Sequence, residues 1–157
     1  MRLVSSSPRT TRLFAEALAK ELLRRPLRFP HATVIALEGS LGVGKTLFTQ
    51  AFARAMGVRR NLPSPTFVFV RRYPLKNNYY QNLFHADAYR LRNAKKKTLA
   101  PLGFFEDLRN PQNLFLVEWA DRIRAAIPHP AIWIFLRHPS RNVARRSSIR
   151  MFRFAAR

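Results

Sequence analysis

Short apolar runs alternate with longer amphipathic segments along the chain. The run 33–37 is rich in β-branched residues and the run 114–117 is wholly apolar, and each has the length of a buried strand. Apolar residues recur at helical spacing in 8–22 and in 45–56, where Gly57 is placed to end the second helix. Strands that alternate with helices predict an α/β fold with a sheet between two helical layers.

The first predicted helix has a recognisable start. Ser7 is a suitable N-cap, and Pro8 suits the first helical position, where a backbone N–H is not needed. We expect its buried face to comprise Leu13, Phe14, Ala17, Leu18 and Leu22. The segment 1–15 is also rich in arginine and serine and lacks acids, which is typical of a transit peptide, so targeting is the alternative interpretation.

The rest of the chain shows no internal repeat or linker. The pattern predicts two strands, two short helices and a terminal antiparallel strand pair, expected at 66–73, 79–89, 99–108, 121–127, 131–137 and 148–154. The turn 74–78 should join the first two strands as a hairpin, and 91–98 should be a basic loop. We therefore predict one domain over 1–157, a three-layer P-loop NTPase fold with a mixed, partly antiparallel sheet.

The composition is strongly basic. The chain has 29 Lys and Arg against 8 Asp and Glu, which gives a net charge of +21. Such a charge attracts RNA or another polyanion, although an arginine bias of the whole genome would produce it as well. The chain has no cysteine, which excludes disulfides and thiolate metal sites, and no apolar run approaches the roughly 20 residues that span a bilayer.

One glycine-rich segment predicts phosphate binding. It follows the first predicted strand, precedes a predicted helix and reads Gly39-Ser40-Leu41-Gly42-Val43-Gly44-Lys45-Thr46. In a P-loop, backbone N–H groups and the helix start hold phosphate oxygens, the lysine neutralises the β- and γ-phosphates, and the threonine hydroxyl ligates Mg²⁺. The sequence thus predicts ATP or GTP binding with Mg²⁺, and the absence of an Asn-Lys-x-Asp signature favours ATP.

Two acids are candidates for the carboxylate that a P-loop enzyme needs near Mg²⁺. Glu118 closes the apolar run 114–117, and Asp87 follows the apolar-rich run 83–86. Either acid is placed to ligate Mg²⁺, often through water, or to position the attacking water. The alternative for each is an ion pair with one of the many arginines.

Three further residues are weaker candidates when each is taken alone. Thr66 follows the P-loop helix, where switch segments that sense the γ-phosphate lie, but it also suits the entry to a strand. Trp119 is placed either beside the nucleotide or in the core, and the core is the usual place for an aromatic residue. His85 has no metal-ligand spacing and is either a polar neighbour of the phosphates or a packed histidine.

The ordered motifs together resemble the TsaE (YjeE) family over nearly the whole chain. They are Leu37-x-Gly39-x-Leu41-Gly-Val-Gly-Lys-Thr46, Ser64-Pro65-Thr66-Phe67, His85-Ala86-Asp87-Ala88-Tyr89-Arg90-Leu91 and Val117-Glu118-Trp119. The resemblance implies a cytoplasmic ATPase that works with TsaB and TsaD in making threonylcarbamoyladenosine in tRNA. It also implies that Lys45 and Thr46 hold phosphates and Mg²⁺, Glu118 lies near Mg²⁺, Asp87 lies beside the γ-phosphate, Thr66 belongs to a switch-like segment and Trp119 lies by the nucleotide.

The sequence departs from the family pattern at three places. Ser40 and Leu47 stand where the family usually has Asp and often a second Thr, and Lys95-Lys96-Lys97 stand in a segment that is commonly acidic. These changes affect the expectation of hydrolysis and partner docking more than that of nucleotide binding. Two other functions therefore stay open: a small-molecule P-loop kinase, and a non-hydrolysing module that binds ATP and RNA.

Overall fold

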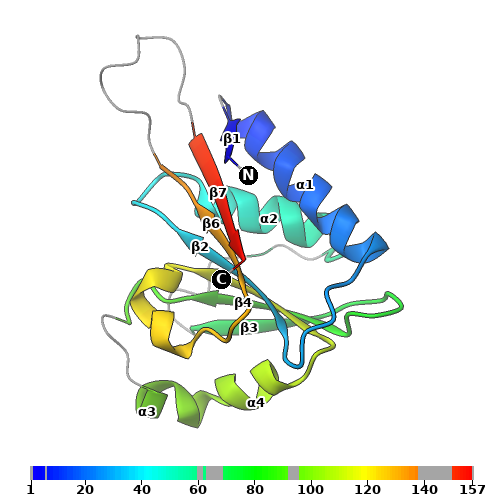
Figure 1. Ribbon diagram of the computed structural model, residues 1–157, viewed down its shortest axis with the longest axis vertical. Coiled ribbons are helices and arrows are strands. Elements are labelled where there is room, and N and C mark those ends of the chain that lie inside the picture. Colours follow the sequence, from blue (N-terminus) through cyan, green and yellow to red (C-terminus); the bar gives the residue numbers. More distant parts are fainter. Residues whose placement is uncertain are drawn as a thin grey trace.

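Seven strands form one mixed sheet with the order β1-β7-β6-β2-β5-β4-β3 (Figure 1). The computed structural model describes residues 2–5, 7–59, 62, 69–91, 96–137 and 150–156. Its elements are β1 Arg2–Ser5, α1 Pro8–Arg24, β2 Thr33–Glu38, α2 Lys45–Ala55, β3 Val70–Pro74, β4 Asn82–Asp87, α3 Lys96–Leu99, η1 Ala100–Leu102, α4 Phe104–Arg109, β5 Asn113–Glu118, η2 Ala120–Ala126, β6 Ile132–Phe135 and β7 Arg150–Ala156.

The centre of the sheet is parallel and its margins are antiparallel. Strands β6, β2, β5 and β4 run parallel, whereas β7 and β1 on one side and β3 on the other are added antiparallel. The carboxyl ends of parallel strands meet at one edge of a sheet, which is where α/β proteins bind ligands. Here that edge carries the loop between β2 and α2 and the ends of β4 and β5.

Helices cover both faces of the sheet, so the predicted three-layer α/β fold is confirmed (Figure 1). Ile35 and Leu116 belong to the core beneath α1 and α2. Val34 and Phe115, their neighbours in the chain, belong to the core beneath α4 and η2. Residues of a strand point alternately to its two faces, so near-continuous apolar strands are what a doubly covered parallel sheet requires.

The start of α1 follows the prediction, but part of its predicted face does not. The backbone N–H of Thr10 donates to the Ser7 hydroxyl at 3.2 Å, which confirms the N-cap. Phe14, Leu18 and Leu22 pack against the core. Leu13 and Ala17 are exposed, because the buried stripe runs through Thr11, Ala15, Ala19 and Leu22.

Several predicted boundaries are wrong. Strand β1 was not expected, and it pairs with β7 from the far end of the chain. Helix α3 begins within the predicted basic loop 91–98. The hairpin of β3 and β4 is confirmed, although β4 begins only at Asn82, and the predicted positions 66–68 lie outside the described residues. Across the part of the chain described, no helix has the length and apolarity needed to cross a membrane.

The aromatic contacts of Phe115 allow a stability prediction. Phe115 is fully buried, and its ring centroid lies 4.5 Å from that of Phe84 and 5.5 Å from that of Phe104. We expect Phe115→Ala to lower the free energy of unfolding by about 3–5 kcal/mol because it leaves a cavity. Leu13→Ala, at a side chain 56% exposed, should change it by less than about 0.5 kcal/mol. Urea denaturation of both variants checks this; equal losses would contradict the described core.

Candidate nucleotide-binding site

The glycine-rich segment forms the loop between β2 and α2. Gly39 lies so close to its surroundings that a Cβ there would clash with the carbonyl oxygen of Leu136, which only glycine avoids. Gly44 is the N-cap of α2 and has a left-handed φ of 101°, which places the loop directly before the helix start. A helix N-terminus that follows such a loop attracts anions through its free N–H groups and its dipole.

Lys45 lies inside this loop rather than in solvent. Its side chain is 5% exposed, and Nζ donates to the carbonyl oxygens of Gly39 at 2.7 Å and Ser40 at 2.9 Å. Nζ also lies 3.6 Å from the centroid of the Trp119 ring, a cation–π contact. The lysine is therefore held beside the cavity by two backbone acceptors and one aromatic face.

Burial lowers the pKa of Lys45 below its usual value, because water solvates the ammonium group better than the protein does. The carboxylates of Glu118, Asp121 and Asp87 oppose this shift, and the positive charge of Arg122 adds to it. The lysine thus belongs to a cluster of charges around the loop, in which the acids compensate part of the cost of burying the cation.

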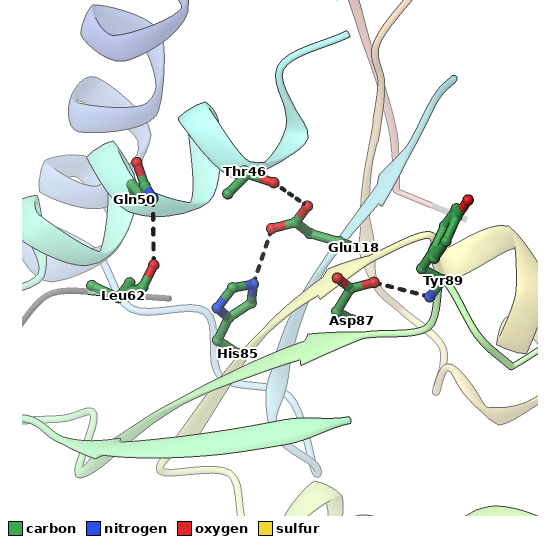
Figure 2. A network of polar contacts seen from close by, with 7 residues as sticks. All are labelled: Thr46, Gln50, Leu62, His85, Asp87, Tyr89 and Glu118. Carbon is green, nitrogen blue, oxygen red and sulfur yellow. Dashed lines mark hydrogen bonds and ion pairs between the residues drawn. The ribbon is translucent and has the colours of Figure 1, made fainter. Parts of the chain in front are cut away.

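Glu118 is buried and connects three elements of the fold (Figure 2). The hydroxyl of Thr46, in the first turn of α2, donates to Glu118 Oε2 at 2.8 Å. The imidazole of His85, on β4, meets Glu118 Oε1 at 3.0 Å through Nε2. Because a carboxylate only accepts hydrogen bonds, Nε2 must carry the proton of that contact. Both oxygens of the Glu118 carboxylate are therefore oriented by neighbouring side chains.

Asp87 stands beside Glu118 at the same edge of the sheet. The two residues are partners in the parallel register of β4 and β5, and Asp87 is 5% exposed. One Asp87 oxygen, Oδ1, accepts the backbone N–H of Tyr89 at 2.9 Å (Figure 2). Parallel pairing thus brings together two acids that are separated by 31 positions in the chain.

Aromatic residues form one wall of the site. Trp119 has a left-handed φ of 58° and turns the chain from β5 into η2. Its ring centroid lies 5.1 Å from that of Tyr89, and the Arg122 guanidinium lies 4.6 Å from the Trp119 ring and 4.8 Å from the Tyr89 ring. Trp119 is only partly buried, so it borders the site while it also packs against the core.

These groups surround one cavity of about 380 Å³, a size that suits a small-molecule ligand. Its lining residues are Leu41, Gly42, Gly44, Lys45, Thr46, Asp87, Tyr89, Glu118 and Trp119. The structure therefore gathers most of the predicted site residues in one place. Gly39, Ser40 and Val43 belong to the same loop but do not line the cavity, and Thr66 lies outside the described residues.

The sequence did not identify the contact between His85 and Glu118 or the contribution of Tyr89 and Arg122. From the sequence, His85 is either a polar neighbour of the phosphates or a packed histidine, and its spacing from the P-loop gives no sign of its partner. Within the described ranges, no group of three or more His, Asp or Glu side chains is arranged to hold a metal ion without other ligands. The oxygen donors among the side chains that line the cavity are the hydroxyls of Thr46 and Tyr89 and the carboxylates of Asp87 and Glu118.

Comparison with known proteins places the chain in a family. The profile described as "Threonylcarbamoyl adenosine biosynthesis protein TsaE" matches residues 5–147. The chain belongs to the TsaE family. A TsaE protein of Rickettsia bellii is 31% identical over 135 residues, 85% of this chain and 84% of its own length. The TsaE protein of Bacillus subtilis is 36% identical over 104 residues, and that of Synechocystis is 33% identical over 96.

The match to those last two relatives is partial, because it spans 61% and 59% of their respective lengths. All three relatives carry the name tRNA threonylcarbamoyladenosine biosynthesis protein TsaE. The crystal structure of Bacillus subtilis YdiB is similar to this TsaE-family chain with a TM-score of 0.70 and 27% identity, covering 99% of this chain and 84% of YdiB. The chain thus shares its fold with YdiB.

The lowered pKa of Lys45 predicts how stability depends on pH. Above the native pKa the folded protein loses the Lys45 proton while the unfolded chain keeps it up to about pH 10.5, so stability should rise across this window. A Lys45→Met variant lacks this contribution. Urea denaturation of both proteins at pH 8 and pH 10.5 checks this. The free energy of unfolding of the native protein should be higher, relative to that of the variant, at pH 10.5 than at pH 8. A difference that stays constant would contradict the burial of the lysine.

Proposed function

We propose that this TsaE-family protein binds ATP with Mg²⁺ and hydrolyses it as a component of tRNA threonylcarbamoyladenosine biosynthesis. The observation that carries the proposal is the buried Glu118 carboxylate, fixed between the Thr46 hydroxyl of the P-loop helix and the His85 imidazole of β4. A P-loop that only bound phosphate would not need a buried, oriented carboxylate beside its threonine. Such a pair is what an NTPase uses to hold Mg²⁺.

The residues present fit Mg²⁺ and triphosphate. Mg²⁺ prefers oxygen donors and usually combines one or two carboxylates with water and substrate phosphates, which matches the Thr46 hydroxyl with Glu118 and explains why no larger acidic cluster is needed. When bound, the ion would neutralise charge on the phosphate oxygens. Lys45 would exchange its carbonyl acceptors at Gly39 and Ser40 for phosphate oxygens, and the N-terminus of α2 would hold the same phosphates.

The two acids are assigned different tasks. Each oxygen of the Glu118 carboxylate accepts a hydrogen bond, and Glu118 would help to hold Mg²⁺. Asp87 lies on the next strand, lines the same cavity and orients the attacking water. The water oxygen would then bond to the γ-phosphorus as the bond between that phosphorus and the β–γ bridging oxygen breaks. The proton that the water loses passes to an oxygen of the released phosphate, and ADP and phosphate leave.

The pathway assignment follows from the family. The relatives are named for tRNA threonylcarbamoyladenosine biosynthesis, and we extend that role to this chain, in the cytoplasm and with TsaB- and TsaD-like partners. Hydrolysis would drive a change in the partner assembly and would not transfer the threonylcarbamoyl group.

A non-hydrolysing ATP-binding module is the second candidate, and Ser40 is the observation that favours it. The family usually has Asp at this position, whereas the Ser40 side chain is exposed and only its carbonyl contacts Lys45. The measured hydrolysis rate separates the two candidates. Activity that depends on Glu118 supports the ATPase, and its absence with intact ATP binding supports the module.

We expect Glu118→Gln to lower the rate of ATP hydrolysis by about 100-fold or more, because the amide removes the charge that holds Mg²⁺. The Kd for ADP measured without magnesium should change less than about 3-fold, since the P-loop is intact. Glu106→Gln, at an exposed position on α4, is the matched control and should leave both values unchanged. Steady-state hydrolysis by Glu118→Gln at the native rate, with and without TsaB- and TsaD-like partners, would refute the assigned role.

The pathway is tested in cells. Depletion of the protein should reduce threonylcarbamoyladenosine in tRNA, as measured by mass spectrometry of tRNA digests. The native gene should restore the modification, whereas Lys45→Ala should not, because phosphate binding is lost. Normal modification after depletion would remove the pathway from the proposal but leave nucleotide binding intact.

A further inference from the structure

A second cavity lies away from the nucleotide site and has a different character. It measures about 810 Å³ and lies between the end of α2 and the edge strand β3. We call it the basic groove; it is lined by 56–59 and by 71–74 with Lys76. Helix α2 begins at the P-loop and its 11 residues are about 16 Å long, so the groove lies about one helix length from the phosphate-binding loop.

The charged side chains that line the groove are all basic. Arg59, Arg71 and Lys76 are exposed, and no ion pair is formed by them with any described residue. All eight acids of the chain fall within the described ranges, and none lines the groove. By contrast, Arg124 and Arg137 are both paired with Glu38. The groove thus concentrates positive charge that the protein itself does not neutralise.

Tyr73 supplies an independent observation at the same place. The residue lines the groove and is 8% exposed, and its buried hydroxyl has no hydrogen-bond partner among the described residues. A buried hydroxyl without a partner costs about 1–3 kcal/mol, so native proteins usually satisfy it. An acceptor oxygen brought by a ligand would do so here.

We propose that the basic groove binds the phosphate backbone of RNA. Guanidinium groups match phosphate oxygens through paired hydrogen bonds, and the groove offers three cations that form no ion pair with a described residue, which suits successive phosphates. The identification of this RNA as tRNA rests on the proposed function. The expectation that the groove binds phosphates does not, because it follows from the groove itself.

The alternative occupant is an acidic protein segment that extends the sheet along β3. The strand argues against it, because β3 ends in Pro74 and carries two exposed arginines, Arg71 and Arg72, in five residues. Proline and charge on an edge strand are the features that discourage the addition of a further strand. Contacts through side chains to a phosphate backbone need no free strand edge.

The test compares two triple variants that each lose three positive charges. The first is Arg59→Gln with Arg71→Gln and Lys76→Gln, in the groove. The control is Arg9→Gln with Arg12→Gln and Lys20→Gln, at exposed positions on α1. Binding of a fluorescent tRNA transcript to the full chain is measured by anisotropy over a range of salt concentrations, and ATP binding is measured on the same preparations.

The groove variant should bind tRNA about 10-fold more weakly or worse, and the slope of log K against log salt should fall by about two to three units. The control should stay within about 2-fold of the native protein. ATP binding should be unchanged in both variants, so loss of RNA binding and failure of the ATPase proposal give different results. Equal losses in the two variants would show a general charge effect and overturn the proposal.

Tyr73→Phe provides a readout that does not depend on charge. It should weaken tRNA binding about 2- to 10-fold, the value of one hydrogen bond, with no change in the salt slope. Unchanged affinity would overturn the assignment of the hydroxyl. Poly-glutamate that displaces tRNA as well as unlabelled RNA does, at equal charge, would show an acidic-protein site instead and also overturn the proposal.

Discussion

The Glu118 carboxylate holds the site together, because it is buried and accepts hydrogen bonds from two elements that the chain places far apart. Thr46 belongs to the helix after the P-loop, and His85 belongs to the neighbouring strand. A buried carboxylate is tolerated only where its oxygens are satisfied, so both contacts are requirements of the fold as well as of the chemistry. The parallel register of β2, β5 and β4 brings these groups to one edge of the sheet. Without that register the glycine-rich loop would lack its neighbouring acids.

Charge is distributed unevenly over this TsaE-family protein. The chain has only eight acids. Three of them, Asp87, Glu118 and Asp121, raise the pKa of the buried Lys45. The basic groove near the other end of α2 has none. The two proposed phosphate sites therefore differ in their charge. In the first, cations and acids would balance around a triphosphate in a cavity, and in the second, cations on an open surface would meet a polymer. Binding at the second site should be the more sensitive to salt.

Local patterns in the sequence predicted much of the fold and most of the residues that line the cavity, because a P-loop with its strand and helix, or an N-cap such as Ser7, is encoded within a few residues. Long-range contacts were missed for the opposite reason. Strand β1 pairs with β7, at the other end of the chain, and the four residues of β1 do not by themselves predict that partner. The contact between His85 and Glu118 joins residues on separate strands. Leu13 was wrongly predicted to be buried. An apolar residue at the margin of the apolar stripe of a helix can lie either in the core or in solvent.

In the proposed function, Glu118 and Thr46 hold Mg²⁺ at the phosphates of ATP bound by the P-loop. A crystal structure with a non-hydrolysable ATP analogue and Mg²⁺ tests it directly. We expect the triphosphate at the N-terminus of α2, with Lys45 Nζ moved from the carbonyls of Gly39 and Ser40 to phosphate oxygens. The ion should lie within reach of Thr46 and Glu118, directly or through one water. An analogue bound elsewhere, or an ion remote from Glu118 in a correctly filled P-loop, would contradict it.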